Sequence, residues 1–335
     1  MGNRTGESRD GTIRASEEAR PGAGRQRERP ILLRRFFGPR YWGHWFGIGL
    51  VRAVNLLPWR LQMACGRMLG RVAWLFARRD RRIADINLRL CLPTLDDDAR
   101  AALIRRHFES LGCAVFETGL VWWASDRRLA PLIEFEGFEH VEHALAAGRG
   151  AILLSAHFTT LEMGARALGT ATPTSIMYAT PRNPLIAELA RRGRGRHAVN
   201  AIPSDEIREL IRDLKRNLVV WYAPDQRYTD KMSAIVPFFG HPAASNVATS
   251  RLARLTGATV LPYFPERRTD RAGYLMRILP PLEGFPSDDP IADTRRFHEL
   301  IEAHVHRCPD QYLWTYKRFK LPGPDGNVYA REVRP

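Results

Sequence analysis

His157 and Glu162 have residue types and a spacing that suit proton transfer, in the run His-Phe-Thr-Thr-Leu-Glu. His157 follows the apolar run Ala151–Ala156, which is typical of a buried strand, and Glu162 lies where a helical stretch begins. A histidine in the turn and a carboxylate in the first helical turn can converge, whereas a continuous helix would put them on different faces. A carboxylate on one imidazole nitrogen leaves the other nitrogen as a base. The pattern therefore predicts His157 as a general base with Glu162 as its partner.

A structural role fits the same residues. Thr159-Thr-Leu-Glu162 has the form of a capping box, in which Thr159 caps a helix and Glu162 bonds back to the Thr159 amide. Glu162 would then stabilise the helix start, and His157 would be incidental. The six residues alone do not separate the two interpretations.

Another carboxylate, Asp225, follows the apolar run Leu218–Ala223. Because α/β proteins bind ligands beyond the carboxyl ends of their strands, Asp225 is expected on the same sheet edge as His157. Arg227 is suited to a bidentate phosphate contact. The alternatives are a Pro-Asp turn for Asp225 and a solvated surface charge for Arg227.

Strands and helices alternate in the part of the chain that contains these residues. A further apolar run, Thr259–Phe264, predicts another strand. Helical stretches lie between the strands, at Leu161–Leu168, Asp205–Lys215 and Ala248–Leu255. A longer helix is predicted from about Asp96 to Trp123, with acidic residues in its first turn. The alternation predicts an α/β fold with a layered central sheet flanked by helices.

The segment Tyr41–Pro58 is apolar and almost long enough to span a bilayer. Arg52 interrupts it, and an arginine in mid-bilayer costs ~2.5–3.5 kcal/mol. The segment is therefore expected to lie along the inner leaflet with both ends cytoplasmic, the alternative being a buried core helix. The predicted organisation is a disordered tail (1–29), a membrane-anchoring helix (30–60), an α/β domain (61–322) and a C-terminal tail (323–335).

The formal net charge of +15 favours an anionic partner: phospholipid, nucleic acid or an acidic carrier protein. None of the four cysteines forms a C-x-x-C pair, so they are expected to be reduced and partly buried thiols. No metal site is predicted.

An ordered series of motifs from about Phe36 to Lys320 resembles the lipid A biosynthesis lauroyl/myristoyl acyltransferases, within the lysophospholipid acyltransferase superfamily. The motifs are RYWGHWFGIGL, RRIADINLRLC, HFESLG, FETG, HFTTLE, NPLI, VVWYAPDQRY, VPFFG, LARLTGA and QYLWTYKRFK. A histidine followed by an acid is a weak signal by itself, but the ordered series is specific.

The resemblance implies an enzyme that moves a fatty acyl chain from a thioester to a hydroxyl of a lipid A precursor. His157 would deprotonate the hydroxyl, and Asp225 would lie in the site. The donor would be acyl carrier protein or a coenzyme A thioester, attacked directly, with no cofactor and no acyl-enzyme. Amides after Phe158, or an arginine, would stabilise the oxyanion. The implied location is the cytoplasmic face of the cell inner membrane, with no nucleic-acid partner.

One block departs from the pattern of related proteins, because Ala179 stands where they often have arginine. The phosphates of an anionic lipid acceptor are instead expected to contact four other arginines, Arg182, Arg194, Arg196 and Arg227. Each of these is also compatible with a solvated surface charge.

Two other functions remain open on the sequence. One is acyl transfer to a different glycolipid, such as a mannosylated phosphatidylinositol. The other is a non-catalytic basic protein that binds membranes. The aromatic and basic run Tyr312–Lys320 suits nucleobase stacking or a lipid headgroup layer, and the resemblance favours the membrane or packing on the core.

Overall fold

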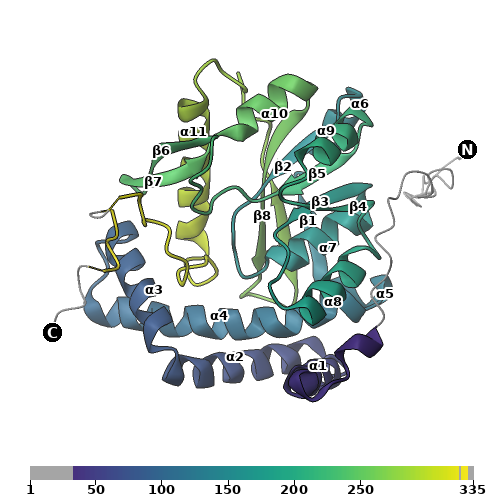
Figure 1. Ribbon diagram of the computed structural model, residues 1–335, viewed down its shortest axis with the longest axis vertical. Coiled ribbons are helices and arrows are strands. Elements are labelled where there is room, and N and C mark those ends of the chain that lie inside the picture. Colours follow the sequence, from purple (N-terminus) through teal and green to yellow (C-terminus); the bar gives the residue numbers. More distant parts are fainter. Residues whose placement is uncertain (1–32, 324–325, 331–335) are drawn as a thin grey trace, which may run out of the picture. The chain divides into compact units, whose positions relative to one another are not determined.

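The computed structural model describes residues 33–323 and 326–330, so the tail expected over residues 1–29 lies outside the described residues. As predicted, the fold is α/β, with a central mixed sheet flanked by helices (Figure 1). The sheet has seven strands in the order β1-β9-β8-β2-β5-β3-β4, and β6 and β7 form a separate antiparallel pair. All neighbours in the large sheet are parallel except β8 and β9.

The strands of the large sheet are β1 (Ile133–Glu136), β2 (Ala151–Leu154), β3 (Thr174–Tyr178), β4 (Asn200–Pro203), β5 (Val219–Tyr222), β8 (Thr259–Arg267) and β9 (Tyr274–Ile278). The separate pair consists of β6 (Ser233–Phe238) and β7 (His241–Asn246). The apolar runs predicted as strands correspond to β2, β5 and β8. Every residue of β2 and β5 is buried, as expected for parallel strands covered on both faces.

The helices are α1 (Trp42–Val54), α2 (Trp59–Phe76), α3 (Arg78–Cys91), α4 (Asp97–Trp123), α5 (Asp126–Leu129), α6 (Glu139–Ala146), α7 (Leu161–Ala171), α8 (Pro184–Arg194), α9 (Ile207–Lys215), α10 (Ala248–Thr256) and α11 (Pro290–Arg307). The predicted long helix is α4, whose N-cap Asp96 accepts a hydrogen bond from the amide of Ala99 at 2.7 Å. The helical stretches predicted between strands correspond to α7, α9 and α10.

Two apolar cores lie on the two faces of the sheet. Alternate residues of β2 point to opposite faces, so Ile152 and Leu154 belong to one core and Leu153 to the other. The first core includes side chains of α3, α9, α10 and α11, and the second includes those of α6, α7 and α8. The long helix α4 contributes to both. The sheet is therefore covered on both faces, and its strand ends are left to form a site.

The segment expected as a single anchoring helix is shorter than predicted. α1 has 13 residues, which corresponds to about 20 Å, less than the ~30 Å of a hydrocarbon core. Within residues 33–323 and 326–330, no helix is long and apolar enough to cross a membrane. None of the residues of α1 is buried, so α1 is not the core helix of the alternative interpretation.

The helix α2 packs closely along α4 on the side away from the sheet (Figure 1). Gly70 of α2 meets Gly112 of α4, and a Cβ at Gly70 would lie 2.1 Å from the carbonyl oxygen of Phe108. Only glycine permits this approach. This close contact fixes the position of α2 against α4.

Candidate active site

The candidate site lies where β2 and β5 end. These strands pair in parallel with Leu154 opposite Tyr222, so His157 and Asp225, each three residues further on, leave the sheet at the same level. The imidazole Nδ1 of His157 lies 2.5 Å from Oδ1 of Asp225. The backbone amide of His157 donates to the other carboxylate oxygen at 3.0 Å. Asp225 therefore fixes both the ring and the backbone of His157.

The carboxylate of Asp225 is buried, with 1% of its side chain exposed. Burial raises its pKa, but the charge and hydrogen bonds of His157, together with the charge of Arg318, lower the pKa below its ordinary value. Tyr312 donates its hydroxyl to Oδ2 at 3.1 Å. An ionised Asp225 accepts the proton on Nδ1 of His157, which leaves Nε2 as the basic nitrogen.

The His157 side chain is 25% exposed, so a substrate can reach the imidazole, whereas its partner is shielded. Next to the pair is a cavity of ≈ 10 Å³, lined by residues that include Asn87, Tyr312 and Arg318. That volume corresponds to about one water molecule. The arrangement can remove a proton from a hydroxyl and hold it as an imidazolium ion stabilised by a carboxylate.

The expected contact between His157 and Glu162 does not form. α7 begins at Leu161, and the Glu162 carboxylate accepts from Nε of Arg194 at 3.2 Å and also from its Nη2. A bidentate guanidinium is a strong partner for a carboxylate, and Asp225 on the neighbouring strand is already in place for the imidazole. Nothing in the described residues joins His157 to Glu162 by a hydrogen bond or ion pair.

The capping-box alternative does not form either. The N-cap of α7 is Thr160, whose side chain makes no cap and donates instead to the carbonyl of Pro265 at 2.6 Å. The hydroxyl of Thr159 pairs with that of Ser110 at 2.7 Å. The two threonines thus attach the turn to α4 and β8 rather than closing the end of α7.

The segment Gln311–Leu313 pairs with the turn that contains His157 and Thr159. The amide of Thr159 donates to the carbonyl of Gln311 at 2.7 Å, and the amide of Leu313 donates to the carbonyl of His157 at 3.0 Å. Phe158 and Tyr312 form an antiparallel bridge between them. Sequence reasoning had no specific role for Tyr312, although its motif QYLW was recognised as part of the resemblance.

The structure does not gather the four expected arginines around His157. Arg194 pairs with Glu162, lies 4.7 Å from the Tyr178 ring centroid, and keeps a buried Nη1 without a partner. Arg196 donates to the Trp122 carbonyl at 2.7 Å. Arg227 donates to a backbone carbonyl of the C-terminal segment, and Arg182 is exposed without a hydrogen bond or ion pair in the described part of the chain. Arg194 thus contacts the first turn of α7, through Glu162, rather than His157.

A separate basic cleft of ≈ 440 Å³ opens beside the turn. Its walls come from α2, α4 and the β8–β9 connection, and its arginines are Arg60, Arg67, Arg106, Arg267, Arg268 and Arg271. Ser110, which pairs with Thr159, lines the same cleft. Arginines on several walls of one cleft are suited to an anionic group.

A buried ion pair lies between this cleft and the sheet. Arg267 contacts both oxygens of Glu117, at 2.5 Å and 2.7 Å, and donates to the Ser110 hydroxyl at 2.8 Å. Tyr274 also donates to Glu117, at 2.9 Å, and Trp59 of α2 donates to the Tyr274 hydroxyl at 3.0 Å. Hydrogen bonds therefore connect the start of α2 to the turn that carries His157.

Comparison with known proteins places the chain among enzymes of one pathway. The sequence profile of the family described as bacterial lipid A biosynthesis acyltransferase matches residues 30–321. The chain is 38% identical over 289 residues to the lipid A biosynthesis lauroyltransferase of Escherichia coli (strain K12), covering 86% of this chain and 94% of the relative. It is 36% identical over 301 residues to the palmitoleoyltransferase of lipid A biosynthesis from that strain, covering 88% and 97%.

A solved structure, the 1-acyl-sn-glycerophosphate acyltransferase of Thermotoga maritima, is 14% identical with a TM-score of 0.34. The match covers 69% of this chain and 97% of that chain, and at that score it supports no comparison of the sites. The family match over most of the residues, together with the two Escherichia coli relatives, is decisive. This chain belongs to the bacterial lipid A biosynthesis acyltransferase family and is an acyltransferase.

Proposed function

We propose that this protein transfers a fatty acyl chain from an acyl thioester to a hydroxyl of a lipid A precursor, with His157 as the general base. The observation that carries the proposal is the partly exposed imidazole whose Nδ1 is held by the buried Asp225, leaving Nε2 as the basic nitrogen. A purely membrane-binding protein would have no need of an imidazole held in this way. Asp225 takes the supporting role that the sequence suggested for Glu162.

The reaction follows from that geometry. Nε2 of His157 removes the hydroxyl proton as the oxygen attacks the thioester carbonyl, so that a new carbon–oxygen bond forms. The carbon–sulfur bond then breaks, and the imidazolium returns its proton to the departing thiolate. Asp225 stabilises the positive charge that exists between these two steps.

The donor proposed is acyl carrier protein, with a coenzyme A thioester as the alternative, and no cofactor takes part. An acidic carrier would be attracted to a chain with a formal net charge of +15. The reaction consumes the thioester as a co-substrate.

The membrane surface proposed is the outer face of the N-terminal helices, at the cytoplasmic side of the cell inner membrane. Large apolar side chains are exposed along both helices: Trp42, Phe46 and Leu50 on α1, and Leu61, Met68, Leu69, Val72, Leu75 and Phe76 on α2. The spacing on α2 follows the helical period, so these side chains form one stripe. Such a stripe, flanked by arginines, suits a helix that lies in the headgroup layer rather than crossing it.

The basic cleft is the proposed site for a phosphate of the acceptor. α2 provides both the apolar stripe and one wall of the cleft, so a lipid whose chains lie in the membrane would have its head group at the cleft. Arg60, Arg67 and Arg106 make no ion pair or hydrogen bond in the described residues and are available to an anion. The cleft thus takes the role that was expected of Arg182, Arg196 and Arg227.

Incubation of the purified protein with acyl carrier thioester and lipid A precursor tests the proposal. The precursor should gain the mass of one acyl chain, and the His157→Ala protein should give almost none. Acylation of a mannosylated phosphatidylinositol in place of the precursor, or no transfer by the folded wild-type protein, would contradict it.

A variant pair tests the phosphate site. Arg106→Ala, which changes a cleft arginine without a partner in the described residues, should raise the KM for the acceptor at least ~10-fold, because a charge-assisted contact contributes ~1.5–3 kcal/mol. The matched control is Arg78→Ala at the start of α3, an exposed arginine that does not line the cleft. Acceptor KM values that match for the two variants would exclude the cleft.

A further inference from the structure

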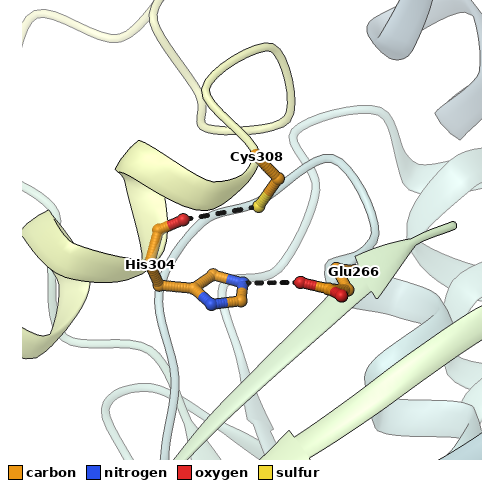
Figure 2. Close-up of side chains that lie close together, drawn as sticks. All are labelled: Glu266, His304 and Cys308. Carbon is orange, nitrogen blue, oxygen red and sulfur yellow. Dashed lines mark hydrogen bonds and ion pairs between the residues drawn. The ribbon is translucent and has the colours of Figure 1, made fainter. Parts of the chain in front are cut away.

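Three side chains with metal-binding atoms converge on the far side of the turn from Asp225. His304 and Cys308 are four residues apart at the end of α11, so they lie on the same face, and Glu266 comes from β8 (Figure 2). One ligand atom from each residue, Nε2, Sγ and a carboxylate oxygen, lies within 4.8 Å of the others. His304 and Cys308 are buried, and Glu266 is partly buried.

The imidazole of His304 is oriented by aromatic rings rather than by hydrogen bonds. Phe264 stacks on it with centroids 4.7 Å apart at 15°, and Phe158 meets it edge-on at 4.9 Å. Nε2 is buried without a hydrogen-bond partner in the described residues and lies 3.8 Å from Oε2 of Glu266. That distance exceeds the length of a hydrogen bond, and a buried nitrogen without a hydrogen-bond partner requires an explanation.

We propose that Glu266, His304 and Cys308 bind a zinc-class divalent cation. Nitrogen and oxygen ligands at bond lengths of ~2.0–2.2 Å in a zinc tetrahedron are about 3.3–3.6 Å apart. The 3.8 Å between His304 and Glu266 is within a few tenths of an ångström of that separation. The Cys308 thiol has only a 3.6 Å contact with the His304 carbonyl, so rotation can bring the sulfur inward. A mixture of nitrogen, oxygen and sulfur ligands favours zinc over magnesium or calcium.

Metal binding replaces the thiol proton of Cys308: the sulfur–hydrogen bond breaks, the thiolate binds the ion and the proton passes to solvent. One thiolate and one carboxylate then neutralise the two charges of the ion.

The position of the cluster gives the ion a structural role. Phe158, next to His157, contacts the His304 ring, and Cys308 leads directly into the segment of Gln311 and Tyr312 that holds the turn. An ion would join the end of α11 to β8 behind that segment. The zinc ion would stabilise the frame of the active site without taking part in acyl transfer.

Cobalt titration of the chelator-treated, full-length protein tests the proposal, because a cobalt–thiolate bond gives a charge-transfer absorption band in the near ultraviolet. One equivalent of Co²⁺ should bind with that band, and Zn²⁺ should displace it. Cys308→Ala should abolish the band, whereas Cys91→Ala, a matched change at another buried thiol, should leave it intact. Absence of the band in the wild-type protein, or its persistence in Cys308→Ala, would overturn the assignment.

Glu266→Gln gives a second measurement that does not depend on the folding of the Cys308→Ala protein. Loss of a negative ligand should weaken Zn²⁺ affinity at least ~10–100-fold, the range typical even of outer-sphere changes. Unchanged affinity in Glu266→Gln would also overturn the site.

Discussion

Two histidines of this protein lie close to carboxylates, and their surroundings give them different properties. His157 is bonded to Asp225 at 2.5 Å and is 25% exposed, whereas His304 lies 3.8 Å from Glu266 and is 2% exposed. A carboxylate in contact supports a cationic imidazole, but burial among rings and near Arg277 disfavours one. A histidine next to a carboxylate is therefore a candidate base only where distance and exposure both permit it.

The largest expected effect comes from removing the exposed histidine. His157→Ala should lower turnover by ~10²–10⁴-fold, because the base is lost. His304→Phe, which keeps an aromatic ring in the stack, should retain most of the activity. Steady-state kinetics of the two variants tests this difference. Equal losses of turnover would show that the distinction between the histidines is wrong.

The two acids near His157 provide the next test. Asp225→Asn keeps the shape of the side chain but removes the charge that stabilises an imidazolium, so turnover should fall by ~10²-fold or more. Glu162→Gln loses only an ion pair with Arg194 and should lower turnover about tenfold or less. Single-turnover rates with saturating thioester measure both changes. A larger loss in Glu162→Gln would restore Glu162 as the partner of His157.

The smallest expected effect is on the pH dependence of stability. In the metal-free protein the pKa of His304 is lowered to about 3, so between that pH and its ordinary value of 6.5 the unfolded chain binds a proton that the folded chain excludes. The contribution of His304 to the free energy of unfolding is fully present above pH 6.5 and is lost as the pH decreases through this window. The charged groups facing His304 are Glu266 on β8, Arg277 on β9 and Arg307 on α11.

His304→Phe should reduce this loss of stability, measured as the difference in urea midpoint between pH 7 and pH 5. The decline should not vanish, because burial also lowers the pKa values of His107 and His298 to about 4. His143→Ala is the control, since it removes an exposed histidine of α6. An identical pH dependence in wild type and His304→Phe would show that His304 takes up its proton without unfolding.

The sequence predicted the sheet and the position of His157 because both depend on local patterns. The buried strands β2 and β5 are continuous apolar runs, and the parallel arrangement then placed Asp225 on the same edge as His157. Which carboxylate bonds to His157 depends on the register between those strands and on Arg194, which pairs with Glu162 although it is far from it in the sequence. Neither a register nor a competing guanidinium can be read from six residues.

The remaining differences have similar physical origins. The arginines expected to bind phosphate were selected because they follow predicted strands in the sequence. The basic cleft is instead built from α2, α4 and the β8–β9 connection, which meet only in the folded chain. The segment expected as a C-terminal tail from residue 323 contains Tyr329, which is buried and donates to Asn87 at 2.6 Å. An isolated tyrosine near a chain end gives no pattern from which such packing could be predicted.

The hydrogen bonds from Trp59 through Tyr274, Glu117 and Arg267 to Ser110 have a consequence for mutation. Glu117 is 1% exposed, and an uncompensated buried charge costs ~3–5 kcal/mol, so the pair cannot be changed one residue at a time. Ser110 at its end holds the threonine next to the reactive turn. The helix proposed to face the lipid and the turn that carries His157 are thus joined by one buried hydrogen-bond network. A change of one member of the Glu117–Arg267 pair is therefore expected to disturb both regions together.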